Sequence, residues 1–197
     1  YSMVKQCMTN FEIMEQVPDT MLYLDKIEAV RQTIRDEEFA EKWRDLEVTY
    51  IYGDTGTGKT RHVMEKYGYR NVYRVTDYRH PFDGYMGQDV IFFEEFRSSL
   101  PLGDMLKYLD GYPVVLPCRY ANRQACFTKV YIGTNICIDE QYTDIQRNDI
   151  KDFLAFLRRI NTVKYYSPEG VRTYGILLRK DGFRIVTEGE VIPFENT

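Results

Sequence analysis

One stretch of the chain has the residue types and spacing of a phosphate-binding loop. Residues 53–60 read Gly-Asp-Thr-Gly-Thr-Gly-Lys-Thr, which fits the pattern G-x-x-x-x-G-K-T. The glycines let such a loop turn tightly and aim backbone N–H groups inward, the lysine can bridge the outer phosphates, and the last hydroxyl can bind Mg²⁺. We therefore expect a nucleoside triphosphate and Mg²⁺ at Gly53, Asp54, Thr55, Gly56, Thr57, Gly58, Lys59 and Thr60.

The sequence on either side of this loop supports the interpretation. A short β-prone run at residues 48–52 precedes it, and residues 61–67 can continue as a helix that Gly68 ends. A phosphate-binding loop must join a strand to a helix N-terminus, and both flanks fit. The alternative is a glycine-rich turn that matches the pattern by chance.

Two acids follow a second apolar run about thirty-five residues downstream. Residues 90–93 read Val-Ile-Phe-Phe and lead into Glu94 and Glu95, as in a buried parallel strand that presents carboxylates at its end. Nucleotide hydrolysis needs one acid to hold Mg²⁺ through its water shell and another to polarise the attacking water. We assign the metal to Glu94, together with Thr60, although many strands end in acids without such a role.

A polar residue also follows the strand expected at residues 128–132. Gly133-Thr134-Asn135 comes directly after it, and a side chain there can sense the γ-phosphate or orient water. Asn135 is therefore a further candidate for the catalytic site.

Residues 111–138 contain three basic residues and several aromatic residues but no Asp or Glu. The chain as a whole has a net charge of -4 and a pI near 5.4, so any nucleic-acid surface must be local. Cations interleaved with stacking side chains suit single-stranded nucleic acid. The DNA-binding candidates are Arg119, Tyr120, Arg123 and Lys129, and the alternative is a hairpin with ordinary surface charges.

Helical periodicity appears on both sides of this region. Tyr23, Ile27, Val30 and Ile34 form one apolar stripe, and Phe39, Trp43 and Leu46 repeat the spacing, which predicts two helices before the phosphate-binding loop. These stripes either pack on the core of this chain or face another subunit.

A further amphipathic helix is expected at residues 149–160, and it ends with Arg158 and Arg159. Either arginine could reach the phosphates of a neighbouring subunit, because a guanidinium stabilises the charge that develops in phosphoryl transfer. The alternative is that both are basic residues favoured by the helix dipole.

Other features of the chain exclude several classes of protein. No run is long enough to span a bilayer, and the four cysteines and two histidines lack zinc-site spacing, so we expect reduced thiols and no metal cluster. Residues 173–194 alternate apolar and polar residues around Lys180-Asp181-Gly182, which predicts a β-hairpin. The start at Tyr1-Ser2 suggests an excised part of a longer protein.

Four elements in a fixed order resemble the superfamily 3 helicase domain of Rep proteins, the rolling-circle replication initiators of small circular single-stranded DNA viruses and related bacterial plasmids. They are GDTGTGKT (53–60), FDGYMGQDVIFFEEF (82–96), LPCRYANRQACFTKVY (116–131) and IGTN (132–135). The resemblance covers about residues 46–160. It implies an α/β P-loop fold of the AAA+ type, with a central, mostly parallel sheet flanked by helices.

The resemblance also implies roles for individual residues. Gly53–Thr60 correspond to the Walker A motif, Glu94 and Glu95 to Walker B, Asn135 to motif C and the segment with Arg119, Arg123 and Lys129 to a DNA-gripping hairpin. The L-R-R-I segment at 157–160 is similar to the arginine-finger region. Residues 20–46 would be a helical oligomerisation region, 47–160 the ATPase domain, 161–197 a β-rich extension and 1–19 the end of a preceding nicking domain.

On this basis we expect an ATP-driven helicase that assembles as a hexameric ring and moves 3′ to 5′ on single-stranded DNA. It would act in the host nucleus for a eukaryotic virus, or in the cytoplasm for a plasmid or phage. The chain departs from the family in Walker B, where members often carry Asp and this chain has Glu94-Glu95, and it has no His-x-His nicking motif. A nucleotide-gated assembly module, an RNA helicase and a small-molecule kinase remain alternatives.

Overall fold

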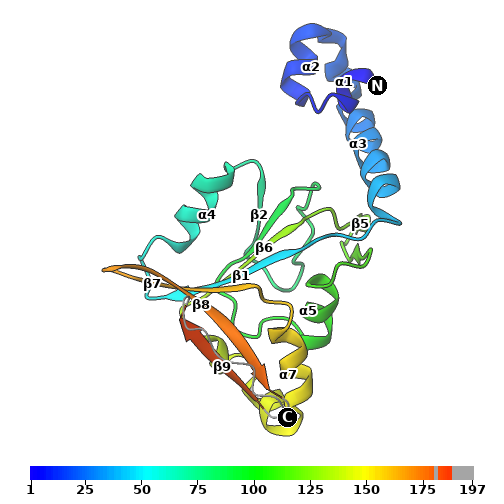
Figure 1. Cartoon of the computed structure of the whole chain (residues 1–197). Coiled ribbons are helices and arrows are strands. Elements are labelled where there is room, and N and C mark those ends of the chain that lie inside the picture. The colour runs from blue at the N-terminus through cyan, green and yellow to red at the C-terminus, as the bar shows by residue number, and fades with distance from the viewer. Residues whose placement is uncertain (180–181, 188–197) are drawn as a thin grey trace.

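A sheet of seven strands forms the centre of the computed structural model, which describes residues 1–179 and 182–187 (Figure 1). The first five strands in the sheet run parallel, and the last two add an antiparallel hairpin. The fold is therefore α/β with a central, mostly parallel sheet, as the sequence predicted. In spatial order the strands are β2 (Val72–Val75), β3 (Val90–Phe93), β6 (Lys129–Gly133), β1 (Glu47–Gly53), β7 (Thr162–Ser167), β8 (Gly170–Arg179) and β9 (Gly182–Thr187).

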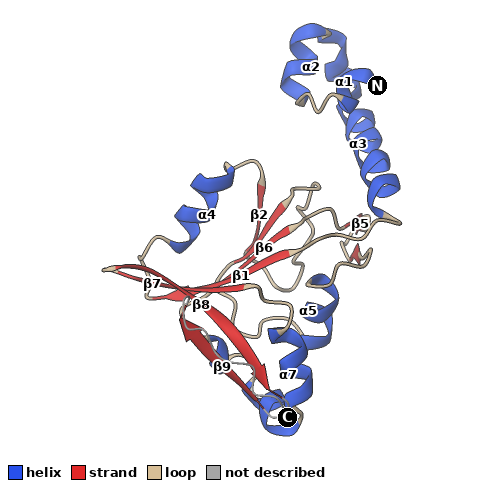
Figure 2. Ribbon diagram, viewed as in Figure 1, coloured by secondary structure: helices blue, strands red, loops and turns tan. Residues whose placement is uncertain are grey.

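Helices cover both faces of this sheet, because successive side chains of a buried strand point to opposite faces (Figure 2). On one face, Ile51 of β1 packs in a cluster with Val63 and Met64 of α4 (Lys59–Tyr67). On the other face, Val48 and Tyr50 join a larger core. The helices on that side are α5 (Leu102–Tyr108) and α7 (Ile150–Leu157), with α6 (Thr143–Asn148) directly before α7.

Several elements lie where the periodicity placed them. The apolar strand before Glu94 is confirmed, and α4 ends at Gly68, whose φ is +84°. Asp149 caps α7 by accepting a hydrogen bond from the backbone N–H of Lys151. Strands β8 and β9 form the expected C-terminal hairpin, although residues 180–181 and 188–194 of that prediction lie outside the described residues.

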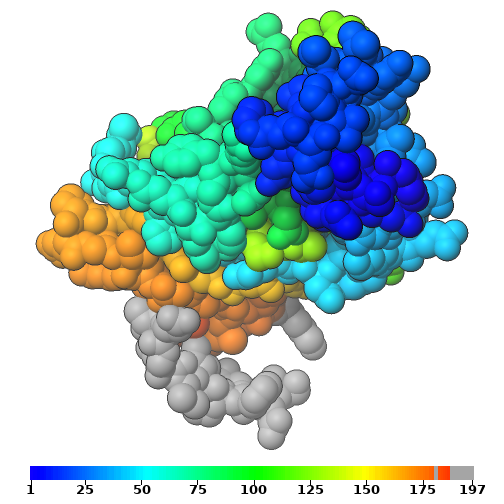
Figure 3. Space-filling model, turned by 90° about the horizontal axis from the view of Figure 1, so that it is seen from above, coloured from blue at the N-terminus to red at the C-terminus, as the bar shows by residue number. Residues whose placement is uncertain are grey.

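The chain before β1 forms a helical region that stands beside the sheet (Figure 1). Its elements are α1 (Ser2–Lys5), α2 (Asn10–Gln16), a 3-10 helix (Pro18–Tyr23) and α3 (Leu24–Phe39). The sequence predicted α3 but neither α1 nor α2, although Thr9 and Glu12 form a capping box, a recognisable start signal. No residue of α3 is fully buried. The residues of the helical region, blue in Figure 3, lie together on one part of the face shown there.

The second helix predicted before the phosphate-binding loop, over Phe39, Trp43 and Leu46, is wrong. α3 ends at Phe39, and residues 40–46 are irregular before β1 begins. Tertiary hydrogen bonds hold this segment: the N–H of Arg44 donates to Gly111 O at 2.8 Å, and its buried guanidinium donates to three more carbonyls, those of Phe127, Asp110 and Tyr112. These long-range contacts override the local helical spacing.

Strand β7 continues the parallel sheet beyond residue 160. It pairs with β1, with Thr49 opposite Thr162, so residues 162–167 are part of the central sheet. The division of the chain into domains stays a prediction. In the part of the chain that the structure describes, no helix is both long and apolar enough to cross a membrane.

The Arg44 contacts make a testable contribution to stability. Replacing Arg44 with Ala leaves three carbonyls without their charged donor, so the free energy of unfolding should fall by about 3 kcal/mol. Urea denaturation measures the change. Arg147→Ala is the matched control, because within the described part of the chain this exposed arginine has one ion pair, with Asp144 at 3.6 Å. Its loss should cost under about 0.5 kcal/mol. Equal effects of the two substitutions would contradict the role of Arg44.

Candidate active site

The predicted phosphate-binding loop joins the end of β1 to the start of α4. Gly53 has a φ of +140°, and a Cβ there would lie 2.0 Å from the carbonyl oxygen of Tyr166 on β7, so only glycine fits. Gly58, with a φ of +83°, stands directly before the first residue of α4. The helix N-terminus therefore faces the loop, an arrangement that favours anions. Asp54, Thr55, Gly56 and Gly58 are exposed, and Thr57 is half-buried.

The Lys59 ammonium group lies inside this loop. Its Nζ donates to the carbonyl oxygens of Gly53 at 2.6 Å and Asp54 at 2.7 Å, and Thr57 Oγ1 lies 3.4 Å away. Burial lowers the pKa of Lys59, and the charges of Glu95 and Asp54 oppose this effect. The loop thus encloses the Lys59 ammonium group. A bound phosphate would take the place of the Gly53 and Asp54 carbonyls as its hydrogen-bond partner.

Glu94 lies next to Thr60, the residue with which the sequence prediction has it share a metal ion. Thr60 Oγ1 donates to Glu94 Oε1 at 3.0 Å, and Arg74 Nε donates to Glu94 Oε2 at 3.0 Å. A hydroxyl and one carboxylate are oxygen ligands of the kind that Mg²⁺ uses together with substrate phosphates, so the residues fit the ion. A cage of three or more His, Cys, Asp or Glu side chains is not found among the described residues.

Glu95 differs from Glu94 in backbone conformation and exposure. Its φ is +50°, in the left-handed region that non-glycine residues rarely adopt, and its side chain is exposed. The charge of Glu95 acts on Lys59, so the second acid lies near the loop as well. The two acids therefore differ in backbone conformation and in exposure, which suits them to different roles.

Asn135 lies at the same edge of the sheet, two residues after β6. Its Oδ1 accepts a hydrogen bond from Arg97 Nη2 at 2.6 Å, and the N–H of the preceding Thr134 donates to Ile51 O at 3.0 Å. Because parallel strands end at one edge, β1, β3 and β6 bring the loop, both acids and Asn135 together.

Sequence reasoning missed three residues of this site. Arg74 on β2 contacts Glu94, Arg97 contacts Asn135, and the Tyr78 hydroxyl donates to Glu94 O at 2.7 Å. For Arg74, the available signal in the sequence was a basic residue near the end of β2, the strand that pairs with β3. The partners are separated by between 16 and 38 residues, so no local pattern joins them.

Arg158 and Arg159 lie far from this edge. They follow α7 and precede Asn161, whose Oδ1 accepts from the N–H of Val48 at the start of β1. Arg159 Nη2 donates to Asp110 Oδ2 at 2.6 Å and Nη1 to Ala155 O at 2.8 Å. Arg158 is exposed, and the described residues offer its side chain no hydrogen bond or ion pair. Neither arginine joins the loop within one chain.

The four DNA-binding candidates separate into two groups. Arg119 and Tyr120 lie in the loop of a small hairpin formed by β4 (Val115–Leu116) and β5 (Arg123–Gln124), and the guanidinium of Arg119 lies 5.8 Å from the ring centroid of Tyr120. Tyr120 is 92% exposed, whereas Arg119 also pairs with Asp83.

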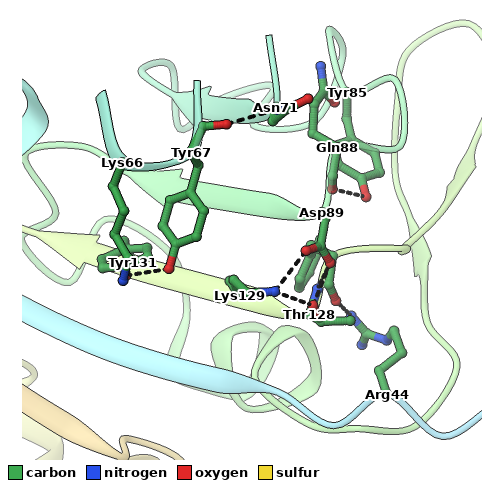
Figure 4. Close-up of polar contacts among 11 residues, drawn as sticks. Arg44, Lys66, Tyr67, Asn71, Tyr85, Gln88, Asp89, Thr128, Lys129 and Tyr131 are labelled. Carbon is green, nitrogen blue, oxygen red and sulfur yellow. Dashed lines mark hydrogen bonds and ion pairs between the residues drawn. The ribbon is translucent and has the colours of Figure 1, made fainter. Parts of the chain in front are cut away.

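The other two candidates contact different elements. Arg123 Nη1 donates to Gln32 Oε1 of α3 at 2.7 Å. Lys129 begins β6, and its Nζ lies 2.9 Å from Asp89 Oδ2, a carboxylate that also contacts Thr128 (Figure 4). The structure thus brings together only Arg119 and Tyr120 of the four.

Comparison with known proteins finds replication-associated proteins of circoviruses as homologues. The chain is 28% identical to that of Goose circovirus over 160 residues, which cover 81% of this chain and 51% of the relative. It is 30% identical to that of Canary circovirus over 134 residues, covering 67% of this chain and 43% of the relative. For Beak and feather disease virus the identity is 33% over 89 residues, or 45% of this chain and 30% of the relative.

The chain therefore spans about half the length, or less, of these curated relatives. No family model matches the sequence. Among solved structures, the S. cerevisiae Hsp104:casein complex in its extended conformation aligns with a TM-score of 0.37 and 16% identity, over 73% of this chain and 33% of that one. A similarity this low carries no argument about function.

The contact between Arg74 and Glu94 predicts a competition with Mg²⁺. Arg74→Ala frees the carboxylate, so the Mg²⁺ concentration that gives half-maximal binding of a fluorescent ATP analogue should fall about fivefold, as expected for a partly exposed pair of about 1 kcal/mol. Titration of Mg²⁺ at fixed protein measures this. Arg61→Ala, which removes an exposed pair with Glu65, is the control. An unchanged or higher Mg²⁺ requirement in Arg74→Ala would contradict the competition.

Proposed function

We propose that this chain is the ATP-hydrolysing, DNA-translocating part of a replication initiator. The observation that carries the proposal is the meeting of a glycine-bounded loop, a buried lysine, two acids and an amide at the carboxyl edge of one parallel sheet. The homologues are named replication-associated proteins, which connects such a nucleotide site to replication.

Each residue of the site has a role that suits phosphoryl transfer. The loop N–H groups and Lys59 would bind the phosphates, and Thr60 and Glu94 would hold Mg²⁺, which neutralises phosphate charge when bound. Glu95, exposed beside the loop, would polarise the attacking water. Asn135, held by Arg97, would orient that water or contact the γ-phosphate.

The arginine that completes the site would come from a neighbouring copy. Arg158 lies near the start of β1, and the phosphate-binding loop follows the end of this strand. The five residue steps from Val48 to Gly53 span about 17 Å. Arg158 is our choice of finger, because Arg159 is held by Asp110 and Ala155 whereas Arg158 is exposed. A guanidinium in this role accelerates phosphoryl transfer about 10³-fold or more.

This arrangement would produce a ring. The loop edge of one copy would face the Arg158 edge of the next, which is a head-to-tail contact between different surfaces, and such contacts close into rings when the rotation allows. The hexameric state rests on the family resemblance. Within the ring, the exposed Tyr120 and the adjacent Arg119 would contact single-stranded DNA by stacking and charge.

Steady-state ATP hydrolysis, with and without an oligonucleotide, tests the proposal. Turnover should rise when single-stranded DNA is added and should vanish in Lys59→Ala, because that change removes the cation inside the loop. Lys151→Ala, an exposed lysine at the start of α7, is the control and should keep wild-type turnover. Nucleotide and DNA binding without hydrolysis would instead indicate an assembly module, and hydrolysis indifferent to DNA would exclude a motor.

A further inference from the structure

Two exposed aromatic side chains meet at the edge of the sheet opposite the phosphate-binding loop. The rings of Trp43 and Tyr112 contact edge to face, with centroids 5.0 Å apart. Trp43 is 54% exposed and Tyr112 is 67% exposed. Trp43 is the sole tryptophan of the chain. Large rings with one face open to solvent are suited to stack on another planar group.

The backbone beneath these rings is rigid. The buried guanidinium of Arg44, next to Trp43, donates to the carbonyl oxygens of Asp110 at 2.9 Å and Tyr112 at 3.2 Å, and so connects the two segments. Gly111 leaves room for the indole, because a Cβ at this position would lie 2.4 Å from the Trp43 ring. The pair is therefore a preorganised platform and not two mobile surface side chains.

A hollow of about 320 Å³ lies beside this platform and has Trp43, Arg158 and Arg159 among its lining residues. The acids there are already engaged: Asp45 Oδ1 accepts from Trp43 Nε1 at 3.0 Å, and Asp110 Oδ2 accepts from Arg159 at 2.6 Å. Among the described residues, the exposed guanidinium of Arg158 has no hydrogen bond or ion pair. Arg159 Nε also lacks a partner there, but it is buried and does not face the hollow. The hollow thus offers a stacking face and one exposed cationic donor, the guanidinium of Arg158.

We propose that this hollow binds a nucleotide, with its base stacked on Trp43 and its phosphate on Arg158. A planar aromatic group joined to an anion matches both parts of the site. The nucleotide has two sources: the ATP in the loop of a neighbouring copy, a case that rests on the function proposed above, or one residue of a single DNA strand. The two sources can be tested separately, with an ATP analogue as one probe and a DNA strand as the other.

The fluorescence of Trp43 tests this directly, because no other tryptophan contributes. A non-hydrolysable ATP analogue and an oligothymidylate are titrated separately, and filter binding of the same labelled probes measures total binding in parallel. Stacking should quench or shift the emission as the site fills. For bound ATP of a neighbour, the change should depend on protein concentration and disappear in Lys59→Ala. For a DNA strand, it should persist in Lys59→Ala and weaken with salt.

Substitutions separate stacking from folding. Trp43→Ala should weaken filter binding of the correct probe about tenfold, whereas Trp43→Phe should restore most of it, because a ring remains available for stacking. Tyr69→Leu, at an equally exposed tyrosine after α4, is the matched control for Tyr112→Leu and should leave both binding and Trp43 emission unchanged. Circular dichroism confirms that each variant is folded.

Two results would overturn the inference. Filter binding with no change in Trp43 emission would show that the probes bind elsewhere, and this leaves the proposed ATPase site intact. Equal affinity of Trp43→Ala and wild type for both probes would exclude a stacking role. Loss of ATP hydrolysis in Lys59→Ala is measured independently, so failure here is distinguishable from failure of the proposed function.

Discussion

Strand β1 pairs with a parallel strand on each side, and this pairing determines where the functional residues lie. Parallel strands begin at one edge of a sheet and end at the other, so the loop after β1, the acids after β3 and Asn135 after β6 gather at one edge. Arg158 and Trp43 precede strand starts and lie at the opposite edge. The five residue steps of β1 from Val48 to Gly53, about 17 Å, keep these two sets of residues apart within one chain.

Groups of the chain itself contact the charged side chains of the nucleotide site. Lys59 donates to backbone carbonyls of the loop, and Glu94 accepts from Thr60 and Arg74. Phosphates at Lys59 and Mg²⁺ at Glu94 would compete with these contacts, so the net free energy of binding would be smaller than the sum of the contacts formed. Arg74 is important in this respect, because it sits on β2, outside every motif of the sequence, yet controls the carboxylate that we assign to the metal.

Local patterns were sufficient to predict the elements whose structure depends on neighbouring residues. The glycine spacing located the loop, and the continuous apolar run at residues 90–93 located β3. The prediction failed where residues distant in the sequence determine the local structure. Arg44 donates hydrogen bonds to carbonyls 66 to 83 residues away, and residues 40–46 are irregular instead of helical. The pairing of Lys129 with Asp89, 40 residues apart, likewise could not be read from the charges of residues 111–138.

The most direct test of a composite site mixes two inactive variants. Lys59→Ala lacks a working phosphate-binding loop but keeps Arg158. Arg158→Ala keeps the loop but lacks the arginine, so its ATP turnover should be lowered about 10³-fold. If a neighbour supplies the arginine, an equimolar mixture should recover a measurable fraction of wild-type ATP turnover, because some interfaces pair an intact loop with an intact arginine. A mixture of Lys59→Ala with Lys59→Met should stay inactive. A mixture of Lys59→Ala and Arg158→Ala that hydrolyses no more ATP than its components would contradict the account.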